Sequence, residues 1–595
     1  METTILHHLE RHAKNSADRI AYRDRLAGSW RTTTFAEYNR QTRQVARAFL
    51  SLGLGEGSVV TILSNNRPEW VLSALGAMRV GGVSAGVYTT CSAEEIGYIV
   101  GHAESPLLVV ETVEQLQRVE QVWDSLPDLK TVVVLDGTEG TDNERAIGWN
   151  DLLAFADDTA DEQLDEILTS LRADQVADFI YTSGTTGPPK AVMLTHENLE
   201  WTARTLGTEA GVTSDEVALS YLPLSHIAEQ TASILMPVVF GSEVWFCHEG
   251  LQLAEYLKES RPTTFFGVPR VWERFEAAIK SQLAEATGAK ASIAAWAQGV
   301  GSEWTEVANS GATPSGALKA KYAVADKLLF SKIRAAVGFD RARLLVSGAA
   351  PIPASSLEFF GSLGLIITEL YGQSEDTGPT TTNLPGANKV GTVGRALKGV
   401  EVKIAEDGEI LVRGKNVFPG YYKNQAATDE ALIDGWLHSG DLGSIDGDGY
   451  LSIVGRKKDI IITSGGKNIA PQNIEELLTG LDIVGNAVVV GEQQRFLIAL
   501  LTLEPEAGGR FAAEHGIDGD LATCAEVRTC IEEHINATVN SATARVEHIR
   551  NFVVLPNEFS TDGGELTPTF KIKRNVVSEK YAAEIAAAYE QGQVL

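Results

Sequence analysis

The sequence is poor in cysteine, and its few cysteines form no recognisable pattern. The 595 residues include four of them, with neither C-x-x-C spacing nor histidines at intervals that suit a metal: Cys91, Cys247, Cys524 and Cys530. This scarcity argues against a disulfide framework and against a zinc site. We predict buried or incidental thiols in a reducing compartment.

Long apolar runs are also missing. No stretch approaches the roughly 18 apolar residues of a transmembrane helix, and the start, METTILHHLERHAKN, lacks the apolar core of a signal peptide. The run at 234–240 has the length of a core strand. We therefore expect a cytoplasmic protein and leave peripheral membrane contact open.

Positive charge is the third shortage. Fifty Lys and Arg residues face 79 Asp and Glu residues, which gives a formal net charge of -29. Such a surface repels polyphosphate and argues against a general nucleic-acid binder. An anionic ligand therefore needs a local cluster of cations and backbone N–H groups. The oligomeric state is not readable from the sequence.

The order of the elements predicts an α/β fold. A buried strand at 58–63 precedes Asn66 and Pro68, read as the cap and first residue of a helix, and the next strand follows Gly81. Ser92 and Glu95 form a capping box before a further helix. Repeated strand, helix and strand imply a parallel sheet with helices on both faces.

The same pattern divides the chain into domains. We predict a large N-terminal domain of doubly wound α/β subdomains at 1–455, with a helical insertion at 284–321 and a small antiparallel β subdomain at about 385–455. A hinge at 456–460 then leads to a mobile, smaller α/β lid domain at 461–595.

The segment YTSGTTGPPK, at 181–190, is the first candidate site. A Walker A loop is excluded because Lys190 follows Pro189, precedes Ala191 and leads into AVMLT, which is typical of a strand rather than a helix. Its glycines still permit close backbone approach, and its hydroxyls and N–H groups can hold an anion. A mobile surface loop is the alternative, and this segment alone does not decide.

Four further motifs decide. They are YGQSE (371–375), GWLHSGDLG (435–443), GRKKDIIITSGGKNIAP (455–471) and TPTFKIKR (567–574). With the loop, they resemble the acyl-adenylate-forming enzymes in order and spacing. LPLSHIAEQ, ADKLLFSKIR, LVSGAAPI and YGQSEDTGP are similar to the long-chain and bubblegum-type acyl-CoA synthetases.

This resemblance implies a two-step reaction. A fatty acid carboxylate attacks the α-phosphate of ATP, which gives acyl-AMP and pyrophosphate, and the thiol of coenzyme A then displaces AMP. The implied cofactors are ATP, Mg²⁺ and coenzyme A. Two alternatives stay open: a fatty-acyl-AMP ligase that loads a carrier protein, and a non-catalytic nucleotide-binding relative.

The resemblance also assigns residues to the phosphates and the reacting carboxylate. Lys571 is the implied catalytic lysine, and Thr182 and Glu375 are the implied Mg²⁺ partners. His226 lies near the implied acyl pocket and thiol entrance, although a core histidine is the favoured alternative. The implied phosphate cradle is Thr182, Ser183, Gly184, Thr185, Thr186, Gly187 and Lys190.

The remaining implied residues hold the nucleoside and coenzyme A. Tyr371 stacks on adenine, Asp441 binds both ribose hydroxyls, and Arg456 contacts the same sugar. Lys458 is the hinge about which the lid turns. The base is lined by Gly348, Ala349, Ala350, Pro351, Gly372, Gln373 and Ser374, and the pantetheine tunnel by Gly465, Gly466 and Lys467.

Overall fold

A computed structural model describes residues 3–26, 28–182, 188–248, 252–561, 563–567 and 571–593. The central residues of the predicted phosphate loop, Ser183 to Gly187, lie outside this part of the chain. None of the described helices is long and apolar enough to cross a membrane.

The first sheet has seven strands in the order β7-β6-β5-β3-β4-β8-β9. All neighbouring strands are parallel except β8 and β9, which are antiparallel. The strand expected after the phosphate loop is present as β9. The strands are β3 (Val59–Leu63), β4 (Val83–Val87), β5 (Leu107–Val110), β6 (Thr131–Val134), β7 (Ala146–Gly148), β8 (Val176–Thr182) and β9 (Lys190–Thr195).

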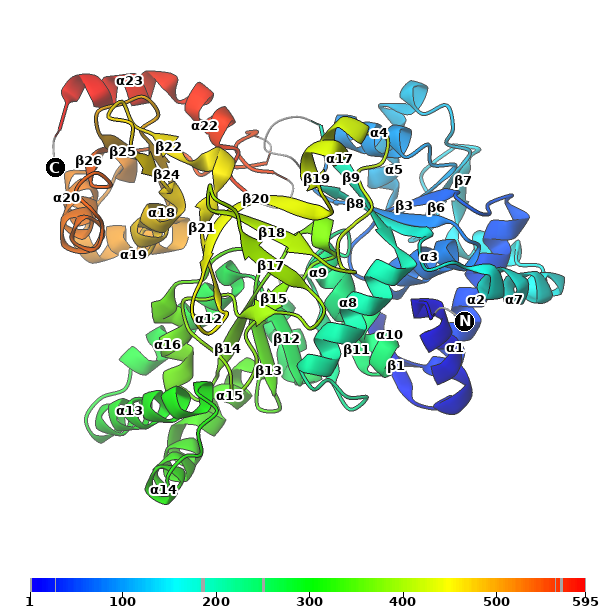
Figure 1. Ribbon diagram of the computed structural model, residues 1–595, viewed down its shortest axis with the longest axis horizontal. Coiled ribbons are helices and arrows are strands. Elements are labelled where there is room, and N and C mark those ends of the chain that lie inside the picture. Colours follow the sequence, from blue (N-terminus) through cyan, green and yellow to red (C-terminus); the bar gives the residue numbers. More distant parts are fainter. Residues whose placement is uncertain are drawn as a thin grey trace.

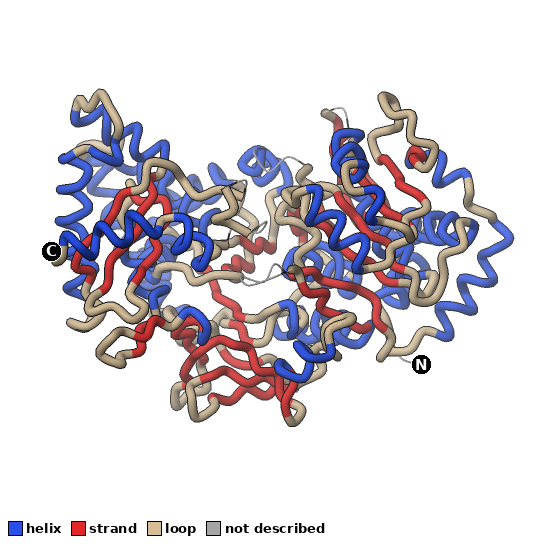
Figure 2. Tube along the Cα trace, turned by 90° about the horizontal axis from the view of Figure 1, so that it is seen from above, coloured by secondary structure: helices blue, strands red, loops and turns tan. Residues whose placement is uncertain are grey.

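Helices cover both faces of this sheet, as the strand–helix pattern predicts (Figure 2). Val60 and Ile62 of β3 belong to one hydrophobic core, and Val59 and Leu63 to another. This alternation confirms a strand buried on both sides. The surrounding helices are α1 (Ile5–Asn15), α2 (Phe35–Ser51), α3 (Pro68–Arg79), α4 (Ala93–His102), α5 (Val113–Glu120), α6 (Trp149–Ala154), α7 (Asp161–Ser170) and α8 (His196–Glu209).

Two local predictions are wrong, and one is confirmed. The N-cap of α3 is Arg67 rather than Asn66, whose amide instead donates to the Leu222 carbonyl oxygen at 2.7 Å. The run at 234–240 is helical, because a fully buried apolar run carries no period that separates helix from strand. The capping box that Ser92 opens is present.

Two more sheets complete the α/β part of the N-terminal domain. One has the order β10-β11-β1-β2 and the other β12-β13-β14-β15-β16. The strands are β1 (Ile20–Leu26), β2 (Ser29–Thr34), β10 (Val217–Ser220), β11 (Glu243–Phe246), β12 (Thr264–Gly267), β13 (Leu344–Ser347), β14 (Ile367–Tyr371), β15 (Thr381–Thr382) and β16 (Arg395–Ala396). The helices among them are α9 (Ile227–Gln230), η3 (Thr231–Leu235), α10 (Met236–Phe240), α11 (Leu253–Ser260), α12 (Pro269–Ala284) and α16 (Ala354–Ser362).

The predicted helical insertion projects from this domain (Figure 1). It consists of α13 (Ala289–Asn309), α14 (Gly316–Ala325), the π-helical turn η5 (Asp326–Phe330) and α15 (Ser331–Val337). The loop at 310–315 breaks it where the sequence predicts. Helix α13 packs against α14 and α16.

The predicted antiparallel subdomain follows. Its strands are ordered β17-β18-β20-β19, and β21 also pairs with β20. They are β17 (Glu401–Ile404), β18 (Glu409–Arg413), β19 (Leu432–Ile433), β20 (Trp436–Ile445) and β21 (Leu451–Arg456), with α17 (Gln425–Ala431) between. The pairing of β20 with β21 places Asp441 opposite Arg456.

The C-terminal domain begins after η7 (Lys457–Asp459) and has hydrophobic clusters of its own. It lies at one end of the molecule, beside the antiparallel subdomain (Figure 1). Its strands are β22 (Ile461–Ile462), β23 (Asn468–Ile469), β24 (Val484–Val490), β25 (Leu497–Leu503) and β26 (Ile549–Val554). Its helices are α18 (Pro471–Thr479), α19 (Pro505–His515), α20 (Ala525–His534), η9 (Ile535–Val539), α21 (Asn540–Ala542), α22 (Arg574–Lys580) and α23 (Ala582–Gln591).

Candidate active site

The end of β14 meets the middle of β20, and four polar side chains join there. The Tyr371 hydroxyl donates to Asp441 Oδ2 at 2.8 Å, and Gln373 Nε2 donates to the same oxygen at 2.6 Å. Arg456 Nε lies 3.1 Å from Asp441 Oδ1. We call Tyr371, Gln373, Asp441 and Arg456 the nucleoside group.

The local backbone explains why this group can form. Tyr371 is the last residue of β14, and Gly372 then turns so tightly that a Cβ would overlap the Gly378 carbonyl oxygen. Only glycine fits such a close backbone approach. The turn aims Gln373 back at β20, where its amide also donates to the Ser439 carbonyl oxygen at 2.8 Å.

Asp441 is the centre of the nucleoside group. Its residue is 5% exposed, and both its carboxylate oxygens contact donors of the group. Burial, and then the charge of Asp441, raise the pKa of the Tyr371 phenol well above its ordinary value, so the hydroxyl keeps its proton. A carboxylate held in this way is an acceptor already in position for the hydroxyl groups of a sugar.

The predicted base-lining turn lies beside this group. Residues Gly348 to Pro351 follow β13, which is paired with β14. A Cβ on Gly348 would come within 2.9 Å of Leu370 Cδ1, so this residue packs directly against the strand that carries Tyr371. Ala349 has φ of +70°, and Ala349, Ala350 and Pro351 are exposed. The structure therefore brings the turn and Tyr371 together.

The predicted phosphate residues meet through a tyrosine that the sequence does not reveal. The Tyr421 hydroxyl donates to Glu375 Oε1 at 2.8 Å, and Lys190 Nζ lies 4.4 Å from the centre of the Tyr421 ring. Thr182 ends β8 directly opposite Lys190 in β9, and its hydroxyl donates to the Lys190 carbonyl oxygen at 3.4 Å. No sequence signal connects Tyr421 to residues so far away in the chain.

Thr182 and Glu375 fit a magnesium ion in donor type. Hydroxyl and carboxylate oxygens are hard ligands, and Mg²⁺ at nucleotide sites takes one or two carboxylates and fills its shell with phosphates and water. Within the described ranges, no cluster of three or more His, Cys, Asp or Glu side chains could hold a metal. Such a sparse protein shell suits an ion that arrives with a polyphosphate.

Lys571 reaches this region from the C-terminal domain. Two hydrogen bonds join it to Thr567: its N–H donates to Thr567 Oγ1 at 3.0 Å, and the Thr567 N–H donates to its carbonyl oxygen at 2.8 Å. The residue keeps solvent-accessible surface, although protein groups around its ammonium group desolvate it. Desolvation and the charge of Arg456 lower the pKa of Lys571, while Asp441 and Glu375 oppose the shift. The ammonium group is thus within electrostatic reach of both parts of the N-terminal site.

His226 is a helix cap as well as a neighbour of Lys571. Its Nδ1 accepts a hydrogen bond from the Ala228 N–H at 3.1 Å at the start of α9. Burial, and then the charge of Lys571, lower the pKa of His226 to about 4, so the imidazole is neutral at physiological pH. The capping bond fits the alternative prediction, which is that His226 is a histidine with its hydrogen bonding satisfied inside the protein.

A buried glutamate in the same motif was missed by sequence reasoning. Glu229 Oε1 accepts from Ser220 Oγ at 2.8 Å, Ser233 Oγ at 2.5 Å and the Tyr221 N–H at 3.1 Å. Burial raises the pKa of Glu229 to about 7. The glutamate stands in LPLSHIAEQ, but nothing in that motif indicates that it is buried.

The predicted hinge residue closely follows the nucleoside group in the chain, whereas the predicted pantetheine residues lie in a separate turn. Lys458 is in η7, and Gly465, Gly466 and Lys467 form the exposed turn between β22 and β23. That turn belongs to the C-terminal domain, since the Gly466 N–H donates to the Thr463 carbonyl oxygen at 2.8 Å. Their roles in domain motion and thiol binding stay predictions.

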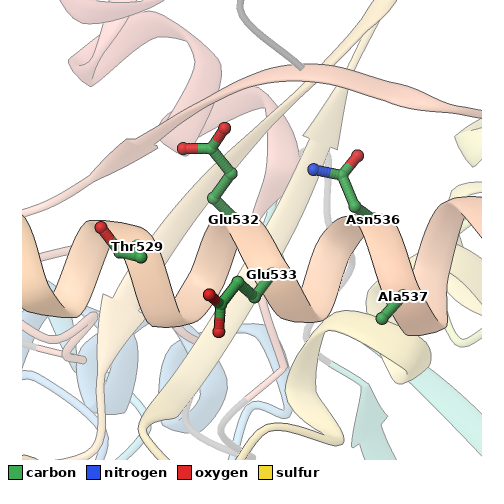
Figure 3. A pocket seen from close by; sticks show the side chains of 5 residues that line it. All are labelled: Thr529, Glu532, Glu533, Asn536 and Ala537. Carbon is green, nitrogen blue, oxygen red and sulfur yellow. The ribbon is translucent and has the colours of Figure 1, made fainter.

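A surface hollow on the C-terminal domain does not suit a nucleotide. Its lining comes from α20 and η9, and Figure 3 shows the side chains: Thr529, Glu532, Glu533, Asn536 and Ala537. Two carboxylates in an open hollow repel phosphate. The converging residues described above are therefore the better nucleotide site.

The fold joins a large N-terminal domain to a smaller C-terminal one, and the candidate nucleotide residues lie mainly on the large domain. Comparison with known families agrees: residues 9–422 match the AMP-binding enzyme family, and residues 458–593 match the AMP-binding enzyme C-terminal domain. The chain belongs to the AMP-binding enzyme family.

Individual relatives are more specific. The chain is 36% identical to the long-chain-fatty-acid–CoA ligase ACSBG2 of Homo sapiens, over 94% of this chain and 88% of that protein. It is 37% identical to the long-chain-fatty-acid–CoA ligase FadD15 of Mycobacterium bovis, over 98% and 96%. The resemblance to bubblegum-type and long-chain ligases is thus confirmed.

Solved structures share the fold. The anthranilate CoA ligase AuaEII in complex with anthranoyl-AMP superposes with a TM-score of 0.72, at 20% identity and 98% coverage of both chains. The o-succinylbenzoate CoA synthetase MenE from Bacillus subtilis, in complex with ATP and magnesium ion, gives a TM-score of 0.66 at 21% identity, over 96% of this chain and 98% of that chain. These likenesses confirm the predicted α/β fold with a large N-terminal and a smaller C-terminal domain.

Proposed function

We propose that this chain is an ATP-dependent long-chain fatty acid:CoA ligase that forms AMP. The observation that carries the proposal is the convergence of Tyr371, Gln373 and Arg456 on the buried carboxylate of Asp441. Identity of 34–37% to long-chain-fatty-acid–CoA ligases over most of the chain supports the same substrates.

In the first step, a carboxylate oxygen of the fatty acid forms a bond to the α-phosphorus of ATP, and the bond to pyrophosphate breaks. Lys571 would offset the negative charge that gathers as two anions meet. Asp441 and Arg456 would hold the ribose, Tyr371 would stack on adenine, and Lys190 would bind the phosphates. Mg²⁺ held by Thr182 and Glu375 would neutralise part of the phosphate charge when bound.

In the second step, the thiol of coenzyme A attacks the acyl carbon and AMP leaves. Lys571 then has to leave the site, so a rotation about Lys458 would exchange it for Gly465, Gly466 and Lys467 beside the pantetheine arm. Closure about a few hinge residues lets one site serve two steps. The separate hydrophobic clusters of the C-terminal domain support its movement as a unit.

Chain length follows from the relatives rather than from a described tunnel. Each buried methylene contributes about 0.8 kcal/mol, so an apolar pocket would favour long acids over acetate but accept a range of lengths. A cytoplasmic location and peripheral contact with membranes, where such acids partition, belong to this proposal.

The test is product analysis with ATP, Mg²⁺, palmitate and coenzyme A. We expect palmitoyl-CoA, AMP and pyrophosphate in equal amounts. Formation of ADP and phosphate would refute the proposal. Palmitate-dependent pyrophosphate exchange without a coenzyme A thioester would identify a carrier-loading ligase, and binding of ATP without exchange would identify a non-catalytic relative.

A further inference from the structure

The helical insertion exposes an unusual share of apolar side chains. Among the described residues, ten large hydrophobic side chains are exposed, and four of them lie on α13, α14 and η5: Ile293 (40% exposed), Trp296 (42%), Val324 (51%) and Leu328 (40%). Of the other six, three lie in the antiparallel subdomain (Ile433, Ile445 and Val454) and three elsewhere (Phe155, Ile462 and Val546). Single exposed apolar residues are common, whereas a concentration of them marks an interaction surface.

Helix α14 is apolar on two sides. Its inner side buries Leu318 and Ala325, and Tyr322 stacks on Trp304 of α13 with ring centres 4.2 Å apart. Its outer side has exposed Ala317, Ala320, Val324 and Leu328, spaced by three or four residues so that they form one stripe. A helix usually buries one apolar face, so a second apolar stripe that is exposed is available to a further partner.

The charge beside this stripe is the opposite of the charge of the whole chain. Helix α14 has two lysines and no acidic residue, although the net charge of the protein is -29. Lys327 and Lys332 follow directly, and the one acidic residue among them, Asp326, accepts from Arg334 at 2.5 Å. Lysines beside an apolar stripe complement an anionic lipid surface.

The shape also favours a lipid surface over a folded protein partner. The α13–α14 pair projects from the body of the molecule (Figure 1), and the exposed stripe lies on a helix rather than in a groove. A bilayer needs no matching concave surface, whereas a peptide or a compact ligand is usually bound in a groove.

We propose that the protein docks on anionic membranes through this projection. The tip face, defined as Ala317, Ala320, Val324 and Leu328 with Lys319 and Lys327, lies on the bilayer, with the apolar side chains at the boundary of the acyl chains and the lysines among the headgroups. The inference deepens the proposed function, because a long-chain acid partitions into the same bilayer that the tip face binds.

The test is flotation of the full chain with vesicles of phosphatidylcholine and phosphatidylglycerol at 3:1, and with phosphatidylcholine alone. We expect stronger binding to the anionic vesicles, and weaker binding as salt is added. The double variant Val324→Ser/Leu328→Ser should lower the partition coefficient about tenfold or more. Lys319→Gln/Lys327→Gln should lower it by about tenfold on the anionic vesicles alone.

The matched control is Ile445→Ser/Val454→Ser in the antiparallel subdomain, where the two side chains are 38% and 41% exposed. We expect the control to float like the parent. Failure of the parent to float, flotation of the Val324/Leu328 variant like the parent, or an equal loss in the control would overturn the proposal. So would binding of acidic proteins by the parent without binding of vesicles.

Failure of this inference is distinguishable from failure of the proposed function. The Val324/Leu328 variant should make acyl-CoA from water-soluble octanoate at the parental rate. A parent that floats but forms no acyl-CoA would keep the tip face and refute the ligase. A parent that forms acyl-CoA but does not float would keep the ligase and refute the tip face.

Discussion

The two sides of the candidate active site are built differently. In the nucleoside group, Tyr371, Gln373 and Arg456 all contact one buried carboxylate, that of Asp441, so these side chains hold one another in place. Lys571, by contrast, is held by backbone hydrogen bonds to Thr567, and it keeps solvent-accessible surface. Nucleotide recognition is thus preorganised within one domain, while the cation depends on where a second domain lies.

The largest effect on activity should come from replacing Lys571 of the C-terminal domain. Lys571→Ala should lower palmitate-dependent pyrophosphate exchange roughly 10²–10³-fold, because a positioned charge is lost where anions meet. Binding of AMP should change little, and so should thioester formation from added palmitoyl-AMP. Lys573→Ala is the matched control and should retain exchange. A Lys571 variant that loses AMP binding instead would place this residue in the nucleoside group.

A change in the nucleoside group should mainly weaken nucleotide binding. Asp441→Asn weakens the acceptor shared by three donors, and a hydrogen bond to a charged group contributes about 1.5–3 kcal/mol. We therefore expect AMP affinity, measured by calorimetry, to fall roughly 10–100-fold. Asp446→Asn, on an exposed turn of the same subdomain, is the control. Unchanged AMP affinity with a slower adenylation rate would contradict the assignment of Asp441 to nucleotide binding.

The contact between the domains should depend on pH. Burial, and then the charge of Glu476, raise the pKa of Glu369 in the large domain to about 8. Burial, and then the charges of Glu475 and Glu273, raise the pKa of Glu476 on α18 of the small domain to about 7. Carboxyls with raised pKa values bind protons more tightly in this arrangement, which is therefore most favoured near the ordinary carboxyl pKa of 4.5 and below. The arrangement loses that advantage progressively as the pH rises from 4.5 to the raised values of about 7 and about 8.

Energy transfer between dyes on the two domains, measured from pH 6 to 9, should follow this change. One proton limits the change in the equilibrium to about tenfold per pH unit. Glu476→Gln should flatten the profile, and Glu533→Gln, in the open hollow of Figure 3, should not. A profile that Glu476→Gln leaves as steep as before would rule out proton linkage at this contact.

The smallest effect should come from His226. Because the pKa of this group is lowered from 6.5 to about 4, its contribution to folding stability is present above pH 6.5 and is lost as the pH falls toward 4. His226→Ala should reduce this dependence in thermal unfolding and cost about 1 kcal/mol for the lost cap, which His226→Asn should restore. A step near pH 6.5 in the adenylation rate that disappears in His226→Asn would instead assign it a proton-transfer role.

The sequence predicted what depends on local pattern. The strands of the first sheet, the break in the helical insertion and the antiparallel subdomain follow from apolar periodicity and turn residues. Tyr421 escaped prediction because its contact with Glu375 joins separate elements, and Asn66 because a distant carbonyl oxygen competes for its amide. The run at 234–240 was misread because uniform burial removes the period. Ser183 to Gly187 lie outside the described residues, so the phosphate cradle stays a prediction.

One feature of the antiparallel subdomain has a mechanical consequence. Strand β21 ends at Arg456, and η7 begins at the adjacent residue, Lys457. Arg456, which pairs with Asp441, is therefore the last strand residue before the chain passes from the large domain to the small one. A rotation about Lys458, as proposed, would act two residues away from Arg456, so it would also change the position of the arginine that pairs with Asp441.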